Sequence, residues 1–332
     1  MSEIITTETE KKTRSVAGRL PREFMSRFGA LIGLLLLCSV LSVLSDNFLT
    51  VDNLMNVARQ STVNALLAIG MLLPILTAGI DLSVGSVLAI SIMTMGIVTV
   101  NQGMHPLLGL ASCLAVGALC GWINGILLTK LRLPHPFIST LGMMNVARGV
   151  ALIVTGAAPI FGFPKMVQFL GTESVGPVPV SFLLVIVVYI LFHLFLTRTA
   201  TGRYIYAIGG NKEAARLSGI NVDRVLVIVY TLSGLMAGLA GIVMVGRVNS
   251  AFPLAGQGYE LDAIAAVIIG GASFFGGVGT VWGTLIGALI IAVLRNGLNL
   301  LNVTADLQMA FIGLVIIVAV FVDVLRQRST QK

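Results

Sequence analysis

Two aspartates, Asp81 and Asp262, lie in stretches of the chain that are otherwise almost entirely apolar. A carboxylate inside a membrane can relay protons or bind Na⁺, which is the chemistry of an ion-coupled transporter or a channel. Each also has a structural interpretation, because Asp81 lies in a Gly-rich break and Asp262 near a predicted helix start, where a carboxylate can cap free backbone N–H groups. We expect capping or loop anchoring for both, with ion coupling as the alternative.

Other polar residues interrupt the same stretches, and in hydrocarbon they are costly unless they face the interior of a bundle. They could form the weak hydrogen bonds of a solute pathway, although helix-to-helix hydrogen bonding explains any single one equally well. The predicted pathway or gate residues are Asp81, Ser83, Asn124, Asn145, Arg148, Asp262 and Asn296. Asn64, Ser233 and Arg295 share these stretches, and Arg295 could instead extend to the membrane interface.

Catalytic patterns are absent from the sequence. The three histidines are isolated, and no HExxH or GxSxG motif occurs. Cys38, Cys113 and Cys120 have no metal-ligand spacing and are expected to be packing residues. The phosphate-binding pattern Gly-x-x-x-x-Gly-Lys-[Ser/Thr] does not occur either. We therefore predict no catalytic residue, no metal site and no cofactor bound by this chain, so any ATP and Mg²⁺ would belong to another protein.

The most informative polar segment is residues 211–219, Asn-Lys-Glu-Ala-Ala-Arg-Leu-Ser-Gly. Asn211 is a good N-cap, Glu213 falls in the first turn where the helix dipole favours an anion, and Gly219 is a C-terminal stop. The pattern predicts a short helix that is marginal alone in water and must pack against something. It is either a solvated connection or a helix that docks in a groove on a partner, with Leu217 as its one apolar knob.

The elements around these residues are membrane spans. The chain of 332 residues is 56% hydrophobic and only 11% charged, against about one quarter charged in soluble domains. Apolar stretches of about twenty residues, the length that crosses a bilayer, recur along it. We predict an all-α, polytopic bundle of about ten spans, at 28–45, 57–78, 84–100, 107–129, 136–155, 180–197, 225–245, 261–275, 281–300 and 306–325.

Lysine and arginine predict the orientation, because cytoplasmic loops retain them. They gather in the N-terminal segment, after the fourth span, after the sixth span and at the C-terminus. With ten spans these four regions share one side, so both termini should be cytoplasmic. The predicted domains are a disordered tail at 1–27, a membrane domain at 28–325 with a cytoplasmic loop at 198–224, and a tail at 326–332. The net charge of +7 is then a topology feature, and no nucleic-acid partner is expected.

Glycines recur at small-xxx-small spacing, as in Gly117, Gly121 and Gly125, which lets helices approach closely. A weak internal similarity relates residues 67–90 to 265–290, since each passes from a helix through a Gly-rich break into another helix. Interrupted helices of this kind often lie near the pathway of a transporter, although such breaks can simply be tight turns.

Four segments carry a family resemblance. Glu213-Ala-Ala followed by Gly219 resembles the coupling segment of bacterial ABC importer permeases. The similarity extends to the segments Thr77-Ala-Gly-Ile-Asp-Leu-Ser-Val-Gly-Ser86, Gly258-Tyr-Glu-Leu-Asp-Ala-Ile-Ala-Ala266 and Asn296-Gly-Leu-Asn-Leu-Leu301. Together these four motifs, which follow the family's order along residues 28–325, resemble the ribose-type monosaccharide permeases.

The resemblance implies a permease subunit in the inner membrane. It implies a permease dimer, an ABC ATPase subunit on the cytoplasmic side, and a periplasmic sugar-binding protein that delivers ribose or another pentose, hexose, polyol or furanose. It also implies a coupling helix that contacts the ATPase through Asn211, Glu213, Ala214, Ala215, Arg216, Leu217 and Gly219.

Overall fold

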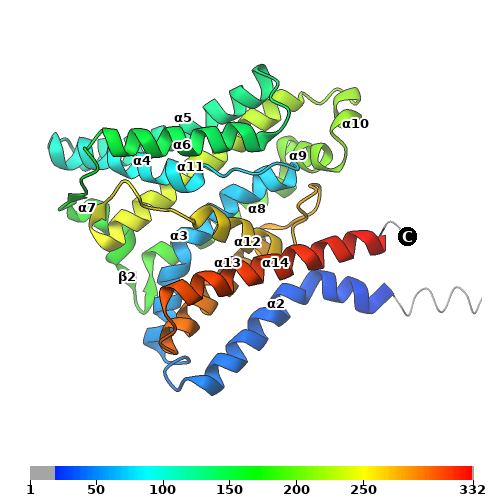
Figure 1. Cartoon of the computed structure of the whole chain (residues 1–332), viewed down its shortest axis with the longest axis horizontal. Coiled ribbons are helices and arrows are strands. Elements are labelled where there is room, and N and C mark those ends of the chain that lie inside the picture. The colour runs from blue at the N-terminus through cyan, green and yellow to red at the C-terminus, as the bar shows by residue number, and fades with distance from the viewer. Residues whose placement is uncertain (1–18, 331–332) are drawn as a thin grey trace, which may run out of the picture.

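The computed structural model describes residues 19–330, and helices make up most of them (Figure 1). The predicted tail at 1–27 lies largely outside these residues, although α2 already begins at Arg19. The helices are α2 (Arg19–Leu44), α3 (Val51–Leu76), α4 (Val84–Gly96), the π-helix η1 (Ile97–Asn101), α5 (Pro106–Lys130), α6 (Pro136–Ile153), α7 (Lys165–Thr172), α8 (Val180–Arg198), α9 (Ala200–Gly210), α10 (Lys212–Leu217), α11 (Val222–Val248), α12 (Tyr259–Ile269), α13 (Val281–Leu300) and α14 (Ala305–Thr330). The predicted helical class is confirmed.

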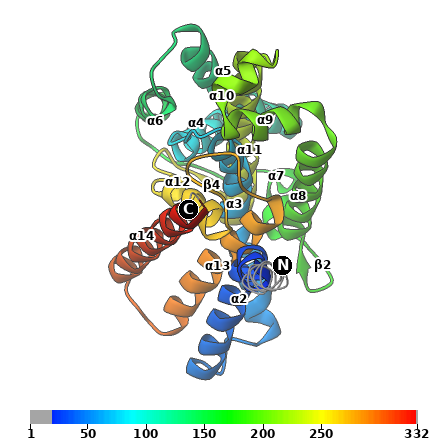
Figure 2. The same cartoon turned by 90° about the vertical axis from the view of Figure 1, so that its right-hand side faces the viewer.

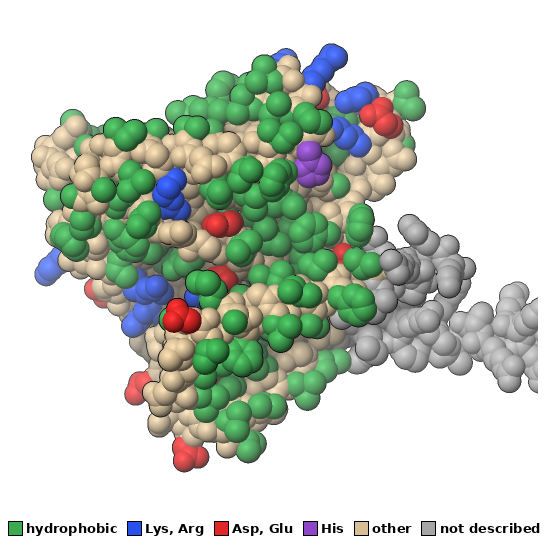
Figure 3. All heavy atoms as spheres, in the orientation of Figure 1, with side chains coloured by type: hydrophobic (Ala, Val, Ile, Leu, Met, Phe, Trp, Pro, Cys, Tyr) green, Lys and Arg blue, Asp and Glu red, His purple; other side chains and the backbone are tan. Residues whose placement is uncertain are grey.

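Seven helical segments of the described chain are long and apolar enough to cross a membrane. They are α3, α4 with η1, α5, α6, α8, α11 and α13. The apolar parts of α2 and α14 are shorter, at Gly29–Leu44 and Ala305–Val318. Figure 3 shows hydrophobic side chains spread over much of one face of this bundle. A surface of this kind suits contact with lipid better than contact with water.

The predicted span at 261–275 differs most from the structure. α12 covers only Tyr259–Ile269, and a helix of that length rises roughly 16 Å, well short of the ~30 Å hydrocarbon layer. The chain leaves the helix at Gly270 and Gly271, where Gly271 has a φ of +93°. The apolar composition continues through this turn, which is why hydropathy alone predicts a longer helix.

α3 is the central helix of the bundle. Every residue from 65 to 76 is buried, and the helix packs against α8, α11, α12 and α13. A helix that is apolar on all sides belongs in the interior of a bundle. The C-terminal half of α3 therefore forms the core around which the other helices are arranged.

The predicted small-residue contacts are present between α5 and α11. A Cβ atom placed on Gly117 would collide with the carbonyl oxygen of Gly234, and one on Gly121 would collide with that of Tyr230. The two backbones approach this closely because no side chain separates them. The glycine spacing therefore holds α5 against α11 over several turns.

The two Gly-rich breaks meet in space. The first joins α3 to α4 at 77–83, and the second joins α12 to α13 at 270–280. The backbone N–H of Gly277 donates to the carbonyl of Leu76 over 2.9 Å. The helix–break–helix similarity seen in the sequence thus corresponds to two segments that lie side by side.

α7 and two short antiparallel strand pairs lie at the end of the bundle opposite α9 and α10. Strand β1 (Ile160–Phe161) pairs with β4 (Ser250–Ala251), and β2 (Ser174–Val175) pairs with β3 (Val178–Pro179). The start of α2, the end of α14, α9 and α10 lie together at the other end (Figures 1 and 2). The termini of the described chain therefore share one end with the segment predicted to be cytoplasmic.

Candidate functional site

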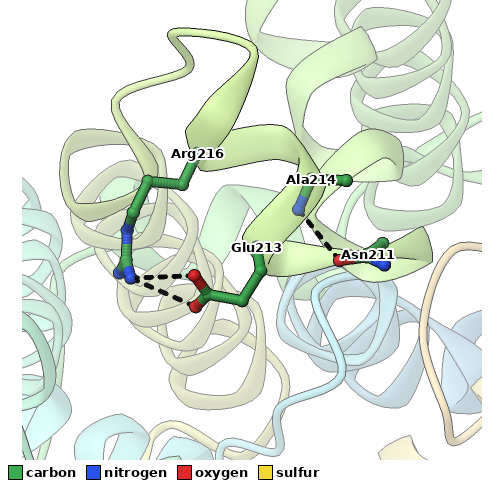
Figure 4. A network of polar contacts seen from close by, with 4 residues as sticks. All are labelled: Asn211, Glu213, Ala214 and Arg216. Carbon is green, nitrogen blue, oxygen red and sulfur yellow. Dashed lines mark hydrogen bonds and ion pairs between the residues drawn. The ribbon is translucent and has the colours of Figure 1, made fainter.

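α10 is a six-residue helix that projects from the end of the bundle, as predicted from its sequence (Figure 1). Asn211 has an extended backbone, and its side-chain Oδ1 accepts a hydrogen bond from the N–H of Ala214 over 2.9 Å (Figure 4). Asn211 also ends α9, so one residue separates the two helices. The predicted N-cap is confirmed, and it fixes the angle at which α10 leaves α9.

The C-terminal end of α10 is closed by a Schellman motif. Gly219 has a φ of +84°, its N–H donates to Arg216, and the N–H of Ile220 donates to Ala215 over 3.1 Å. Glycine fits this left-handed position without a Cβ penalty. An ion pair of 3.1 Å joins Glu213 to Arg216 on the solvent side (Figure 4). α10 is therefore a short helix with both ends satisfied.

The two faces of α10 differ in exposure. Ala215 is buried against the rest of the chain, whereas the side chain of Leu217 is 88% exposed. Figure 3 shows Lys, Arg and acidic side chains gathered around this end of the molecule. A leucine so exposed among charged groups, at the end of a fixed helix, is a suitable anchor for a protein partner.

α9 connects α10 to the two Gly-rich breaks. A Cβ atom on Gly209 would collide with the carbonyl oxygen of Leu76 and would meet the backbone N of Gly277. The last turn of α9 therefore lies in backbone contact with the end of α3 and with the break before α13. A displacement of α9 would reach both interrupted helices directly.

Tyr206 adds a second contact between α9 and the break. Its hydroxyl donates to the carbonyl of Gly279 over 2.9 Å. Burial raises the pKa of the Tyr206 phenol, so the hydroxyl keeps the proton that it donates. α9 is thus attached to the second break through a side chain as well as through its backbone.

Asp81 lies at the centre of a buried polar network in the first break. Its Oδ1 accepts from the N–H of Ser83 at 3.0 Å and from the Ser83 hydroxyl at 2.6 Å. Its Oδ2 accepts from the Ser233 hydroxyl on α11 at 2.8 Å, and Asn124 on α5 donates to Ser83. Asp81, Ser83 and Asn124, three of the predicted pathway or gate residues, therefore lie together in an arrangement that anchors the loop.

Asp262 does not cap α12, contrary to expectation. It lies in the first turn of the helix, and its Oδ2 accepts from Nη2 of Arg295 on α13 at 2.5 Å. Arg295 is therefore directed to this buried carboxylate, and the half-exposed arginine forms an ion pair where extension to the membrane interface was the alternative. Asn296, the next residue, exchanges hydrogen bonds of 2.8 and 3.0 Å with Asn53 on α3.

The two α6 residues among the predicted pathway residues lie apart from these groups. Arg148 donates to the carbonyls of Pro253 and Ala255, at 2.6 and 2.8 Å, in the segment before α12. Asn145 is exposed, and its amide donates to Leu141 of its own helix. The seven predicted residues thus divide into a buried network, an ion pair, an amide pair and two separate contacts.

Sequence reasoning missed two groups. Arg59 and Arg247 line the same cavity as Asp262, and Tyr206 joins α9 to the second break. Arg59 could have been found, because it is a charged residue within the predicted span 57–78. Among the described residues no group of three or more His, Cys, Asp or Glu side chains is placed to hold a metal ion.

A capped projecting helix, two interrupted helices and an apolar bundle are the features expected of a membrane transport subunit. Residues 53–320 match the family model described as the branched-chain amino acid transport system permease component. The chain belongs to this permease family. It is 46% identical to the ribose import permease protein RbsC of Escherichia coli K12 over 94% of this chain and 98% of that protein.

Further relatives carry related names. The ribose import permease protein RbsC of Bacillus subtilis is 44% identical over 90% of this chain and 93% of its own length. The fructose import permease protein FrcC of Rhizobium meliloti is 40% identical over 85% of this chain and 80% of its own length. No solved structure matches the chain.

Proposed function

We propose that this chain is the membrane-spanning permease subunit of an ATP-driven importer for ribose or a closely related monosaccharide. The observation that carries the proposal is α10, an exposed capped helix whose supporting helix touches both interrupted segments of the bundle. The relatives named as ribose and fructose import permeases supply the substrate class. ATP and Mg²⁺ would bind a separate ATPase subunit, and a periplasmic binding protein would deliver the sugar.

The proposed coupling begins where α10 enters a groove on the ATPase subunit, with Leu217 as the apolar anchor. Because Asn211 both ends α9 and caps α10, we expect the two helices to move together. Closure of the ATPase subunits would shift the last turn of α9 against Leu76 and Gly277. The end of α3 and the start of α13 would then move together and open the pathway to the outer side.

The proposed topology retains ten crossings, with both termini and α10 in the cytoplasm of an inner-membrane protein. Asn249, at the end of α11, lies beside the β1–β4 pair, whereas Gly277 lies beside α9 at the other end. The segment 250–276 therefore runs between the two ends of the bundle, as an irregular stretch followed by α12. Irregular backbone at membrane depth is tolerated where protein covers it, and Arg148 supplies hydrogen bonds to it.

A second copy of the chain and a pair of ATPase subunits would complete the importer. The test is reconstitution of the permease in proteoliposomes with its ATPase and binding protein. We expect D-ribose to stimulate ATP hydrolysis and to enter the vesicles, and D-allose and D-fructose serve as competing substrates. Uptake that ceases with a proton or sodium ionophore while ATP is still present would favour the ion-coupled alternative.

A further inference from the structure

A polar cavity lies between α3, α11, α12 and α13, away from the buried Asp81 network. Its volume is about 320 Å³, at the small end of the ~300–1,000 Å³ of small-molecule sites. Its polar walls are formed by Asn56, Arg59, Gln60, Asn64, Arg247, Tyr259, Asp262 and Arg295. Val63, Ile291 and Ala292 complete the lining. A cavity of this size and composition suits one small polar solute.

The cavity lies in the half of the bundle remote from α10. On α3 it involves residues 56–64, whereas the contact with α9 is at Leu76. Twelve to twenty residues of helix correspond to about 18–30 Å. In the proposed orientation the cavity therefore occupies the outer half of the membrane, on the side from which a binding protein would deliver sugar.

Several polar groups around the cavity lack protein partners. Both the Oδ1 and the Nδ2 of Asn64 are buried, and neither has a hydrogen-bond partner among the described residues. The same holds for Nε of Arg59 and Nε of Arg295. Buried amides in native proteins are almost always satisfied by protein, water or ligand. The two amide atoms of Asn64 have almost no accessible surface, so they reach a solute only when the side chain turns toward the cavity; the amide can then both donate and accept, which matches a hydroxyl group.

The charge of the wall also distinguishes between ligand classes. Asp262 is almost fully buried and is paired to Arg295, so the carboxylate remains in the wall. Arg59 and Arg247 add positive charge, which can donate to hydroxyl oxygens. Arg295 neutralises the Asp262 carboxylate, so Arg59 and Arg247 leave the wall with a net positive charge, and an anion is the competing class of ligand. A neutral polyol can donate to the carboxylate and accept from the arginines, and protection by sulfate distinguishes an anion from a polyol.

We infer that this cavity receives the monosaccharide on its way through the permease, with Asn64 and the Asp262–Arg295 pair as hydroxyl partners. The inference rests on the proposed sugar-import function and names the residues that hold the substrate. None of the four motifs that carry the family resemblance contains Arg59, Asn64 or Arg247. These three residues come from α3 and the end of α11 and meet only in the folded chain.

Uptake by reconstituted variants is the first test. Asn64→Leu removes the free amide without breaking any hydrogen bond to a described residue, and we expect the maximal rate of D-ribose uptake to fall by about tenfold. The control is Thr94→Val on α4, whose hydroxyl donates to Ile90 of its own helix and does not line the cavity. Thr94→Val should transport like the wild type. Equal uptake by Asn64→Leu and the wild type would overturn the inference.

Protection from thiol modification is the second test and needs neither partner protein. In a variant whose three cysteines are replaced by alanine, Asn56→Cys places a thiol in the cavity wall, and Glu173→Cys places an exposed thiol outside it. We expect D-ribose to slow N-ethylmaleimide labelling at position 56 and not at position 173. Protection by sodium sulfate and not by ribose, or by neither, would overturn the inference.

The two tests separate the inference from the proposed function. A complex that imports no sugar but shows ribose protection at position 56 would count against the proposed importer and for the cavity. A complex that imports ribose, with Asn64→Leu unimpaired and no protection at position 56, would count against the cavity alone.

Discussion

At the scale of single residues, Asp81 is the centre of a buried hydrogen-bond network. Four polar groups on three elements depend on it or on its partner Ser83, namely the Ser83 N–H and hydroxyl, the Ser233 hydroxyl and the Asn124 amide. Removal of a buried acceptor leaves its donors without a partner. The resulting loss of unfolding free energy is larger than the net contribution of the hydrogen bond itself. Asp81 is therefore expected to matter first for stability.

Asp81→Ala should lower the midpoint of thermal unfolding in detergent, with a loss of about 1–3 kcal/mol of unfolding free energy. The matched control is Asp46→Ala, because Asp46 is exposed in the turn after α2. Its effect should stay within about 0.5 kcal/mol. Asp81→Asn keeps an acceptor for Ser83 and should lie between the two. A stable Asp81→Ala protein that has lost ion-dependent uptake would instead support the ion-coupled alternative.

Asn211 controls the local stability of α10. Loss of an N-cap costs about 1 kcal/mol, which corresponds to about fivefold faster amide exchange in so short a helix. Asn211→Ala should therefore speed hydrogen–deuterium exchange in residues 212–217. Asn221→Ala removes the equivalent cap of α11, where Oδ1 accepts from Arg224, and should leave α10 unchanged. Unaltered exchange in α10 after Asn211→Ala would show that other contacts hold it.

At the scale of elements, the junction between α9 and the two breaks depends on one glycine. Gly209→Ala would drive a methyl group into the carbonyl of Leu76, whereas a Cβ on the adjacent Gly210 meets nothing within 4 Å. We expect Gly209→Ala to reduce transport per ATP hydrolysed while Leu217 remains free to dock. Gly210→Ala should transport normally and gain up to about 1 kcal/mol in stability. Equal coupling ratios in the two variants would remove α9 from the proposed path.

The elements also show how far the sequence could predict the structure. α10 was predicted with its cap and its stop because these features are local, set by Asn211 and Gly219 within a few residues. The span at 261–275 was wrong as a continuous helix, because hydropathy does not register the turn at Gly271. The partners of Asp262 and Asn296 could not be predicted either. Arg295 and Asn53 reach them from other helices, and a single sequence carries no record of such contacts.

At the scale of the whole molecule, the irregular stretch before α12 decides the topology. If the segment 250–276 runs from one end of the bundle to the other, the β2–β3 hairpin and the second break must lie on opposite sides of the membrane. Exposed positions are available at both places, Glu173 in front of the hairpin and Val278 in the break, with Lys212 at α10 as a reference.

Labelling of single-cysteine variants in intact cells with a membrane-impermeant maleimide checks this arrangement. We expect Glu173→Cys to react in intact cells, and Lys212→Cys and Val278→Cys to react only after the membrane is opened. The positive-inside rule supplies the direction, because Lys and Arg are concentrated in the loop at 198–224. Reaction of Val278→Cys and Glu173→Cys from the same side would show that α12 returns to the side it came from. Because Gly277 contacts α9, the second break and α10 must lie on the same side of the membrane. A second break on the outer side would therefore exclude a cytoplasmic α10, and both the proposed topology and the proposed coupling path would be wrong.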